Sequence, residues 1–253
     1  MTLFPGAKQV LLTACAGIIV SLAAFGYLRQ SENEAARDAL QTEAFNLQRE
    51  IRQNMTAHLF ATELLAREWE QNQPSLEQSW QRDAELITLY YQSVQGLAWL
   101  SPTLQIQRFF PPSRQPQLLG TVFKDSDLVE RLQVSSGNRH AMVGSAGNLG
   151  RLSSDVAMFA RIENDDKQGF LGLIISMQDL LNNVIRGNIS EGFQLSLNHQ
   201  GKTLYQFAGD MSLRESWTET RQLQILGNSW QLNIWLTSNK LAQLRGGVSI
   251  AIL

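Results

Sequence analysis

Nineteen consecutive residues near the N-terminus, from Val10 to Leu28, carry no charge (VLLTACAGIIVSLAAFGYL). An α-helix rises about 1.5 Å per residue, so this run spans roughly the 30 Å hydrocarbon core of a bilayer. The sequence therefore predicts a transmembrane helix over 10–28 and a cytoplasmic tail over 1–9. A cleaved signal peptide is the alternative, because Ser21-Leu22-Ala23 has the small residues of a cleavage site.

A second apolar run follows Lys240 and Arg245. Residues 246–253 read GGVSIAIL, which is apolar but too short to cross a bilayer. We expect 241–253 to be the start of a truncated second transmembrane helix. The block between the two runs is then expected to lie outside the inner (cell) membrane, with residues 30–245 periplasmic or extracellular.

The charge and the cysteine content exclude several classes of function. Twenty-one basic and 23 acidic residues give a net charge of −2, which offers no electrostatic footprint for nucleic acid. Cys15 is the only cysteine, so neither an internal disulfide nor a Cys-rich zinc site can form. The three histidines lie in separate predicted elements, without the spacing of a helical metal pair. We therefore expect no metal, no cofactor and no nucleic-acid partner.

The sequence proposes no catalytic constellation either. Gly144-Ser145-Ala146-Gly147 lacks the G-x-S-x-G spacing of a nucleophile elbow. No nucleophile with a base in reach can be identified, so we do not expect this segment to be an enzyme. The Gly- and Ser-rich stretch 144–154 is instead expected to be a loop that lines or covers a pocket.

Residues 30–70 read as one long stalk helix that continues the transmembrane segment. They contain neither Gly nor Pro, and apolar residues recur at spacings of three and four from Ala44 to Trp69. Such a stripe is either the seam of a homodimer formed by two stalk helices or the face that packs on the chain's own domain. His58 lies on this stripe and is expected to be a buried or seam residue rather than a ligand.

The hydrophobic pattern changes its period after Pro74. A helix over 75–91 is followed by period-two alternation, which predicts strands, and a helix over 178–185 leads to two hairpins. The strands are predicted at 96–100, 105–110, 140–143, 156–162 and 170–177, with a helix at 127–134 and hairpins at 193–207 and 221–236. The predicted fold is therefore α+β, with a membrane-distal sheet unit over 71–177 and a membrane-proximal unit over 178–240.

The order of motifs between residues 94 and 182 resembles the CHASE sensor domains, which lie outside the membrane in bacterial and plant receptor kinases and cyclases. Gly96-Leu97-Ala98-Trp99 is similar to the family's first-strand "G-hydrophobic-A-hydrophobic" signature. Leu128–Leu132 followed by Ser136-Gly137 resembles its short helix ending in "TG". The later strands and the crossover are matched by Val143-Gly144-Ser145, Val156–Phe159, Gln168–Leu173 and Met177–Leu181.

This resemblance implies a stalk helix that carries two PAS-like units, with a small ligand in the distal one. We expect the ligand to contact residues on the three strands nearest the Gly- and Ser-rich loop, namely Trp99, Arg108, Ser145, Phe159 and Arg161. Cytokinin receptors have an aspartate where this chain has Gln107-Arg108. Two arginines pointing inward would suit an anionic ligand, because guanidinium groups bind carboxylate or phosphate oxygens in pairs. The alternative is that both arginines are solvent-facing ends of alternating strands.

These features predict the ligand-sensing domain of a membrane-bound signal-transduction receptor, either a two-component histidine kinase or a cyclic-di-GMP enzyme. Its expected partners are a small-molecule ligand, the membrane and a second copy of the chain. The alternative is a protein-interaction or dimerisation module without a small ligand. A sealed polar pocket in the distal unit would favour the sensor, whereas a spacer would fill that volume with side chains.

Overall fold

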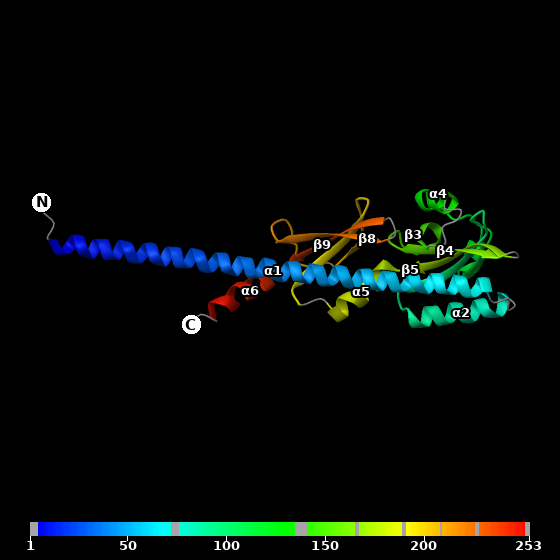
Figure 1. The fold of residues 1–253 in the computed structure, drawn as a ribbon, viewed down its shortest axis with the longest axis horizontal. Coiled ribbons are helices and arrows are strands. Elements are labelled where there is room, and N and C mark those ends of the chain that lie inside the picture. The colour runs from blue at the N-terminus through cyan, green and yellow to red at the C-terminus, as the bar shows by residue number, and fades with distance from the viewer. Residues whose placement is uncertain are drawn as a thin grey trace.

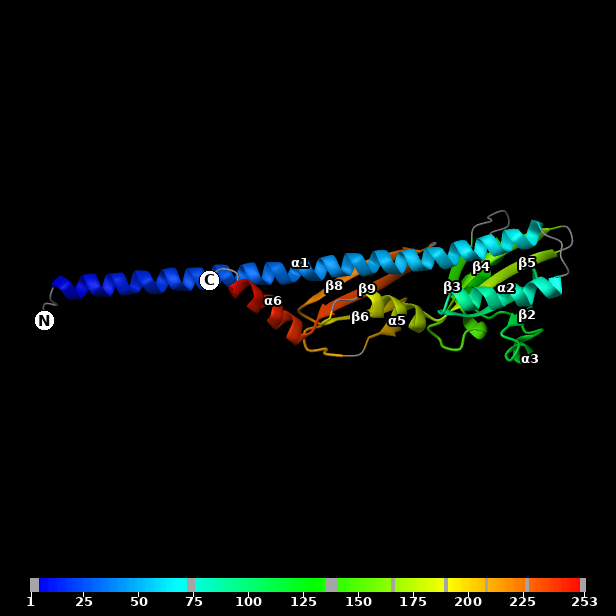
Figure 2. The same ribbon diagram turned by 90° about the horizontal axis from the view of Figure 1, so that it is seen from below.

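The computed structural model describes residues 5–71, 76–134, 141–164, 167–188, 191–207, 209–225 and 228–250. One helix, α1 (Pro5–Gln71), runs along the molecule, and two antiparallel sheets lie against it one after the other (Figures 1 and 2). Its 67 residues extend about 100 Å at 1.5 Å per residue. The N-terminal part of α1 projects alone beyond the sheets.

The first sheet lies at the far end of α1 and has the strand order β2-β1-β5-β4-β3. Helices α1 and α2 (Leu76–Tyr90) cover one of its faces, and short helices lie over the other (Figure 2). The strands are β1 (Val94–Leu100), β2 (Ile106–Phe110), β3 (Met142–Ser145), β4 (Val156–Asn164) and β5 (Lys167–Ile175). The short helices are α3 (Gln115–Leu118), α4 (Ser126–Val134) and η1 (Gly147–Leu149).

The second sheet lies nearer the middle of α1 and has the order β7-β6-β9-β8. Helix α5 (Met177–Asn188) joins the two sheets and packs on α1 and on β7, where Tyr205 Oη donates a hydrogen bond to Asn182 Oδ1 (2.8 Å). The strands are β6 (Phe193–His199), β7 (Lys202–Gln206), β8 (Thr218–Ile225) and β9 (Asn228–Leu236). Helix α6 (Ser238–Ile250) follows β9 and returns to α1.

The predicted α+β fold, a long helix with two PAS-like antiparallel units, is confirmed. Several boundaries shift by two or three residues, and β5, for example, runs from Lys167 to Ile175 instead of 170–177. Ser176 ends the strand because its Oγ accepts the backbone N–H of Asp179 (3.1 Å) and so caps α5. Strand β3 begins at Met142, and the predicted residue 140 and the Ser136-Gly137 motif lie outside the described residues.

The apolar stripe of α1 packs on the chain's own sheets. Leu47 and Ile51 are only 1% and 0% exposed, and α1 contacts β4, β8, α5 and α6. The other buried apolar members of the stripe are Ala36, Leu40, Ala44, Met55, Ala66 and Trp69. Of the two alternatives for the stripe, the structure therefore shows packing within one chain.

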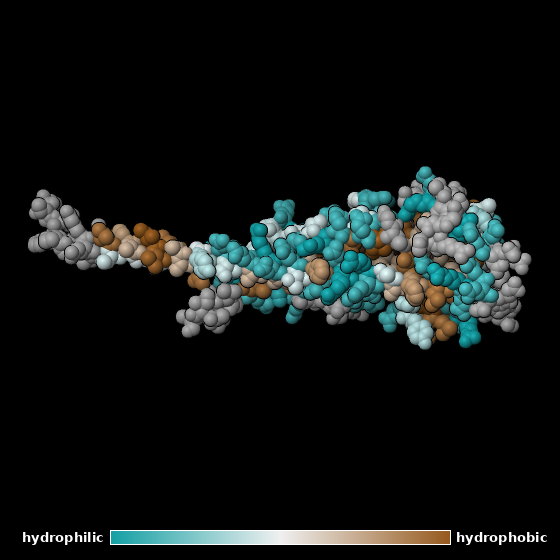
Figure 3. All heavy atoms as spheres, viewed as in Figure 1, coloured by the Kyte–Doolittle hydropathy of each residue, from teal (hydrophilic) through white to brown (hydrophobic). Residues whose placement is uncertain are grey.

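The N-terminal part of α1 has an apolar surface that nothing in the described chain covers. Ile18, Val20 and Phe25 are 60–67% exposed, and Figure 3 shows this stretch as a hydrophobic rod. Among the described residues, α1 is the one helix long and apolar enough to cross a membrane. An uncovered apolar helix is expected to bury this surface in another environment, and a bilayer is one that fits its length.

A buried histidine links α1 to the first sheet. His58 is 4% exposed; its Nδ1 lies 2.6 Å from the carbonyl oxygen of Asn54, and its Nε2 lies 2.8 Å from Ser93 Oγ. A carbonyl only accepts, so Nδ1 carries the proton and Nε2 accepts the serine hydroxyl. Burial lowers the pKa of His58 below its usual value of 6.5.

We expect His58 to make the protein less stable in mild acid. The folded state holds His58 neutral, whereas the unfolded chain binds a proton near pH 6.5, so the free energy of unfolding falls as the pH drops below that value. Urea unfolding between pH 7.5 and 5 measures this loss. A His58→Gln variant should show a shallower slope, and equal slopes would exclude His58 as the cause.

Candidate functional site

The five residues predicted to bind a ligand lie on both faces of the first sheet. Directly paired residues of an antiparallel sheet share a face. Trp99 is paired with Arg108, and both belong to the face covered by α1 and α2. Phe159 and Arg161 belong to the opposite face, with the second apolar cluster. The structure therefore does not bring Arg108 and Arg161 together around one ligand.

Trp99 is part of a tryptophan cluster that joins α1, α2 and β1. Its ring stacks on Trp69, with centroids 5.6 Å apart and planes at 27°, and Trp69 also contacts Trp80 at 5.2 Å. The indole Nε1 of Trp69 donates to Asp83 Oδ2 (2.9 Å). Trp99 is only 7% exposed, so it acts as a core residue, and Arg108 lies half-buried beside it.

Phe159 fills the space that a ligand would need above the centre of the sheet. Its ring lies over Gly172, where an added Cβ would come within 2.4 Å of Phe159 Cε1. Phe109 lies over Gly96 in the same way, with its Cζ 2.9 Å from the position of a Cβ. Phe123 packs on Phe159 with ring centroids 5.1 Å apart. Aromatic rings thus occupy this part of the interior.

The Gly- and Ser-rich loop covers this aromatic core and is fastened to it. Asp155 accepts the backbone N–H groups of Arg151 (2.7 Å) and Leu152 (2.8 Å). The guanidinium of Arg114 donates to the carbonyl oxygens of Leu149 (2.8 Å) and Gly150 (3.2 Å). Ser145, another of the residues predicted to bind a ligand, lies at the edge of this loop. Its Oγ accepts a local hydrogen bond from the backbone N–H of Gly147 (3.2 Å).

Arg161 is the predicted residue that lines a cavity, of about 220 Å³, between the C-terminal end of α1 and residues 160 and 161 of β4. The other four predicted residues do not line it. Glu63, Arg67 and Glu70 contribute both signs of charge to its wall. Glu70 Oε1 also accepts the backbone N–H of Glu163 (2.9 Å), which in turn forms an ion pair with Arg161. Acidic and basic groups together suit a zwitterion better than a simple anion.

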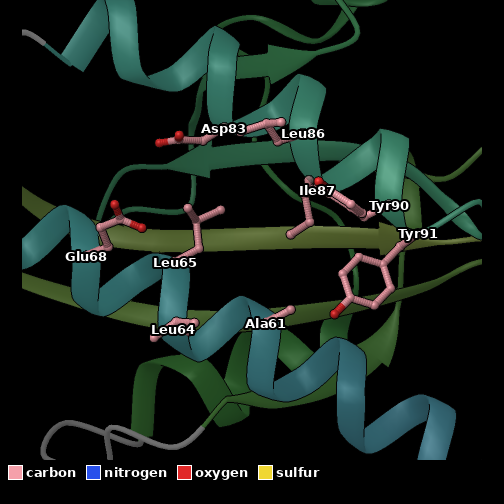
Figure 4. A pocket seen from close by; sticks show the side chains of 9 residues that line it. All are labelled: Ala61, Leu64, Leu65, Glu68, Asp83, Leu86, Ile87, Tyr90 and Tyr91. Atoms are coloured by element: carbon pink, nitrogen blue, oxygen red, sulfur yellow. The ribbon is translucent and has the colours of Figure 1, made fainter.

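An apolar groove lies between α1 and α2 (Figure 4), and the sequence patterns did not predict it. It has a volume of about 540 Å³, and Leu64 and Leu65 of α1 face Leu86 and Ile87 of α2 across it. Large apolar side chains beside it are exposed: Phe60 (64%), Leu64 (55%), Leu86 (41%), Leu89 (74%) and Tyr90 (77%). Phe60 and Leu64 belong to α1, and Leu86, Leu89 and Tyr90 belong to α2. Large apolar residues in addition to those that the core buries were the signal available in the sequence of these helices.

Within the described ranges, no group of three or more His, Cys, Asp or Glu side chains is placed so that it could hold a metal ion. The candidate site consists of three features around the first sheet: the charged cavity at Arg161, the aromatic core around Phe159 and the apolar groove between α1 and α2.

Several solved structures share this fold. A domain of a sensory box/GGDEF family protein from Vibrio parahaemolyticus has a TM-score of 0.56 at 12% identity and covers 83% of this chain and 99% of that chain. The ligand-binding domain of the Campylobacter jejuni chemoreceptor Tlp3, in complex with 4-methylisoleucine, has a TM-score of 0.55 at 13% identity, with coverages of 85% and 96%. At these identities the likeness shows the fold alone.

An extracellular ligand-binding receptor from Desulfohalobium retbaense also matches, with a TM-score of 0.53 at 11% identity. The match covers 74% of this chain, and this chain spans 39% of that receptor's length. Neither the models of known protein families nor the curated protein sequences gave a match. The extracellular domain of a histidine kinase is among the other structures with this fold.

Proposed function

We propose that this chain is the extracytoplasmic ligand-sensing part of a membrane-bound receptor, with residues 10–28 crossing the inner membrane and 30–245 outside it. The observation that carries the proposal is the meeting of α1 and α6 where both head toward the apolar end of the molecule (Figure 1). Arg245 of α6 donates from Nε (3.2 Å) and Nη2 (2.9 Å) to Asn33 Oδ1 of α1. The shared fold of chemoreceptor and histidine kinase sensory domains supports this assignment.

The two helices give a sensor a short mechanical link to the membrane. Both sheets pack on α1, while β9 leads into α6 through Thr237 alone. A ligand shifts this pair only if it binds two arrangements with different affinity. We infer that a rotation or sliding of α6 against α1 carries the signal to an output such as a histidine kinase or a cyclic-di-GMP enzyme.

Cysteine labelling tests the placement relative to the membrane. Cys15 is the only cysteine, so Cys15→Ser gives a background without thiols. In that background Lys202→Cys, at an exposed hairpin end, should react with a membrane-impermeant maleimide from the periplasmic side of intact cells. Lys8→Cys should react only after lysis. The opposite pattern would invert the topology, and release of a shorter soluble product would indicate a cleaved signal peptide.

Thermal unfolding of the full chain in detergent micelles tests the sensing role against single amino acids and organic acids. A ligand at a hundred times its Kd adds about 2.7 kcal/mol to the free energy of unfolding, which raises the melting temperature by several degrees. We expect Arg161→Gln to remove the shift and Arg49→Gln, an exposed charge-matched control, to keep it. No shift with any compound would favour the interaction module instead.

We also propose that a second copy of the chain covers the groove between α1 and α2. Two copies anchored through the same end of α1 stand parallel in one membrane, so the same face of each can meet its equivalent across a two-fold axis. Exposed apolar clusters of this kind mark interaction surfaces in soluble domains. Leu47 and Ile51 lie on the buried stripe of α1 and expose no such apolar surface to a second copy.

Engineered cysteines test whether the groove or the buried stripe of α1 forms the contact between two chains. In the Cys15→Ser background, Leu64→Cys or Leu89→Cys in membranes should form a disulfide between chains under mild oxidation, because both positions are more than half exposed. Leu47→Cys should give little cross-linked product because its side chain is covered by the chain's own sheets. Equal yields at Leu47 and Leu64 would exclude the groove as the dimer contact.

A further inference from the structure

The face of the second sheet that turns away from α1 is built from amide and hydroxyl side chains. Ser196 and Asn233 are paired across β6 and β9 and are 0% and 8% exposed. Thr220 Oγ1 donates to Asn233 Oδ1 (2.9 Å), and Asn233 Nδ2 donates to Ser196 Oγ (3.4 Å). Such burial is unusual for the polar face of an antiparallel sheet, which is commonly solvated.

Residues 209–217, which we call the cover loop, bury this polar face. Gly209 lies against the carboxamide of Gln194, and the indole Nε1 of Trp235 donates to the carbonyl oxygen of Asp210 (2.9 Å). Arg214 lies over the Trp235 ring, with its guanidinium carbon 5.1 Å from the centroid. The cover loop therefore forms a second layer over Gln194 of β6 and Trp235 of β9.

Beside the cover loop the same face opens into a cavity of about 510 Å³. This volume lies within the range of small-molecule sites. The side chains that matter for its chemistry come from the β6–β7 hairpin, the cover loop and the β8–β9 pair: Asn198, Gln200, Thr203, Arg214, Gln222 and Gln231.

The lining has one charge and many neutral polar groups. Arg214 is the single charged residue that lines the cavity in the described part of the chain, and no acidic residue joins it there. An ammonium group would meet no carboxylate in this wall and would be repelled by the guanidinium. Amides and hydroxyls both donate and accept, so they match the hydroxyl groups of a ligand, and a guanidinium matches a carboxylate.

We propose that this cavity is a second binding site, for a small polyhydroxylated carboxylate of the sugar-acid type. Arg214 binds the carboxylate, and the amides of Asn198, Gln222 and Gln231 bind the hydroxyl groups. The site goes beyond the sensing role proposed above, because it uses the second sheet and none of the residues that line the cavity at Arg161.

The cover loop connects this site to both helices that lead toward the membrane. Asp210 Oδ2 accepts the backbone N–H (2.8 Å) and the Oγ–H (2.7 Å) of Ser238, the first residue of α6. These bonds and those from Ser212 hold the pKa of Asp210 well below its usual range; the side-chain bond from Ser212 contributes most. At the other end of the loop, the Trp217 ring lies between two guanidinium groups. Its centroid is 5.9 Å from the guanidinium carbon of Arg37 in α1 and 5.6 Å from that of Arg245 in α6. A ligand that moves Arg214 therefore acts on a loop that touches α1 and α6.

Isothermal calorimetry on the full chain in detergent micelles tests the site with three probes. D-gluconate has hydroxyls and a carboxylate, D-glucitol has the hydroxyls alone, and hexanoate has the carboxylate alone. We expect gluconate to bind at least tenfold more tightly than either of the others. Failure of gluconate to bind at millimolar concentration, or equal binding of hexanoate, would overturn the proposal.

Variants locate the binding. Arg214→Gln should weaken gluconate binding at least tenfold and remove its advantage over glucitol, and Thr203→Ala, on an exposed strand, should weaken it about threefold. Arg49→Gln and Arg161→Gln should bind gluconate as the unaltered chain does, and this result separates the site from the one proposed at the first sheet. Unchanged binding in both Arg214→Gln and Thr203→Ala would place the ligand elsewhere and overturn the assignment.

Discussion

Replacing Trp69 by alanine is expected to lower the free energy of unfolding by about 3–5 kcal/mol, the range for deleting a large buried aromatic side chain. Trp69 is 5% exposed and lies between Trp80 and Trp99, so its removal leaves a cavity where α1, α2 and β1 meet. The change also leaves Asp83 without the indole hydrogen bond. Urea unfolding followed by circular dichroism measures the effect without relying on tryptophan fluorescence.

Phe45→Ala is the matched control, because it removes a large aromatic side chain from α1 that is 52% exposed and does not line the groove between α1 and α2. An exposed substitution of this kind changes the free energy of unfolding by about 0.5 kcal/mol at most. If Trp69→Ala were equally mild, the tryptophan cluster would not hold the end of α1 to the first sheet. A signal from the first sheet could then not be transmitted through that contact.

Hydrophobic periodicity predicted the elements of this fold because each pattern is local. The three-and-four spacing from Ala44 to Trp69 belongs to a single helix, and the alternation in β6 to β9 belongs to single strands. The spacing did not say which surface the α1 stripe would meet. Packing on the chain's own sheets and packing on a second copy bury the same residues, so the sequence left both open.

The candidate site could be predicted less well because it depends on the relation between strands. A strand shows which of its residues share a face, but the register decides how two strands match, and a shift of one residue exchanges the faces. Arg108 and Arg161 each had the right chemistry, yet the pairing of Trp99 with Arg108 and of Phe159 with Gly172 puts them on opposite faces. The cover loop lies over the second sheet through contacts, such as that of Arg214 with Trp235, that no local pattern reveals.

The second large effect is expected at Phe159, whose predicted role as a ligand contact differs from its position in the core. Phe159→Ala should lower the free energy of unfolding by about 3–5 kcal/mol, because the ring is 1% exposed and packs between Gly172 and Phe123. Gly172→Ala should also destabilise, by about 1–3 kcal/mol, because its new Cβ would fall within 2.4 Å of the Phe159 ring.

The double variant decides between the two roles. Once the ring is absent, the Cβ at Gly172 has room and fills part of the cavity, so the combined loss should be smaller than the sum of the single losses by about 0.5–3 kcal/mol. Chemical unfolding of the four proteins gives this coupling energy. Additive losses would mean that the ring does not occupy the space over Gly172. That space would then be available to a ligand, and Phe159 would be restored as a wall of the site beside Arg161.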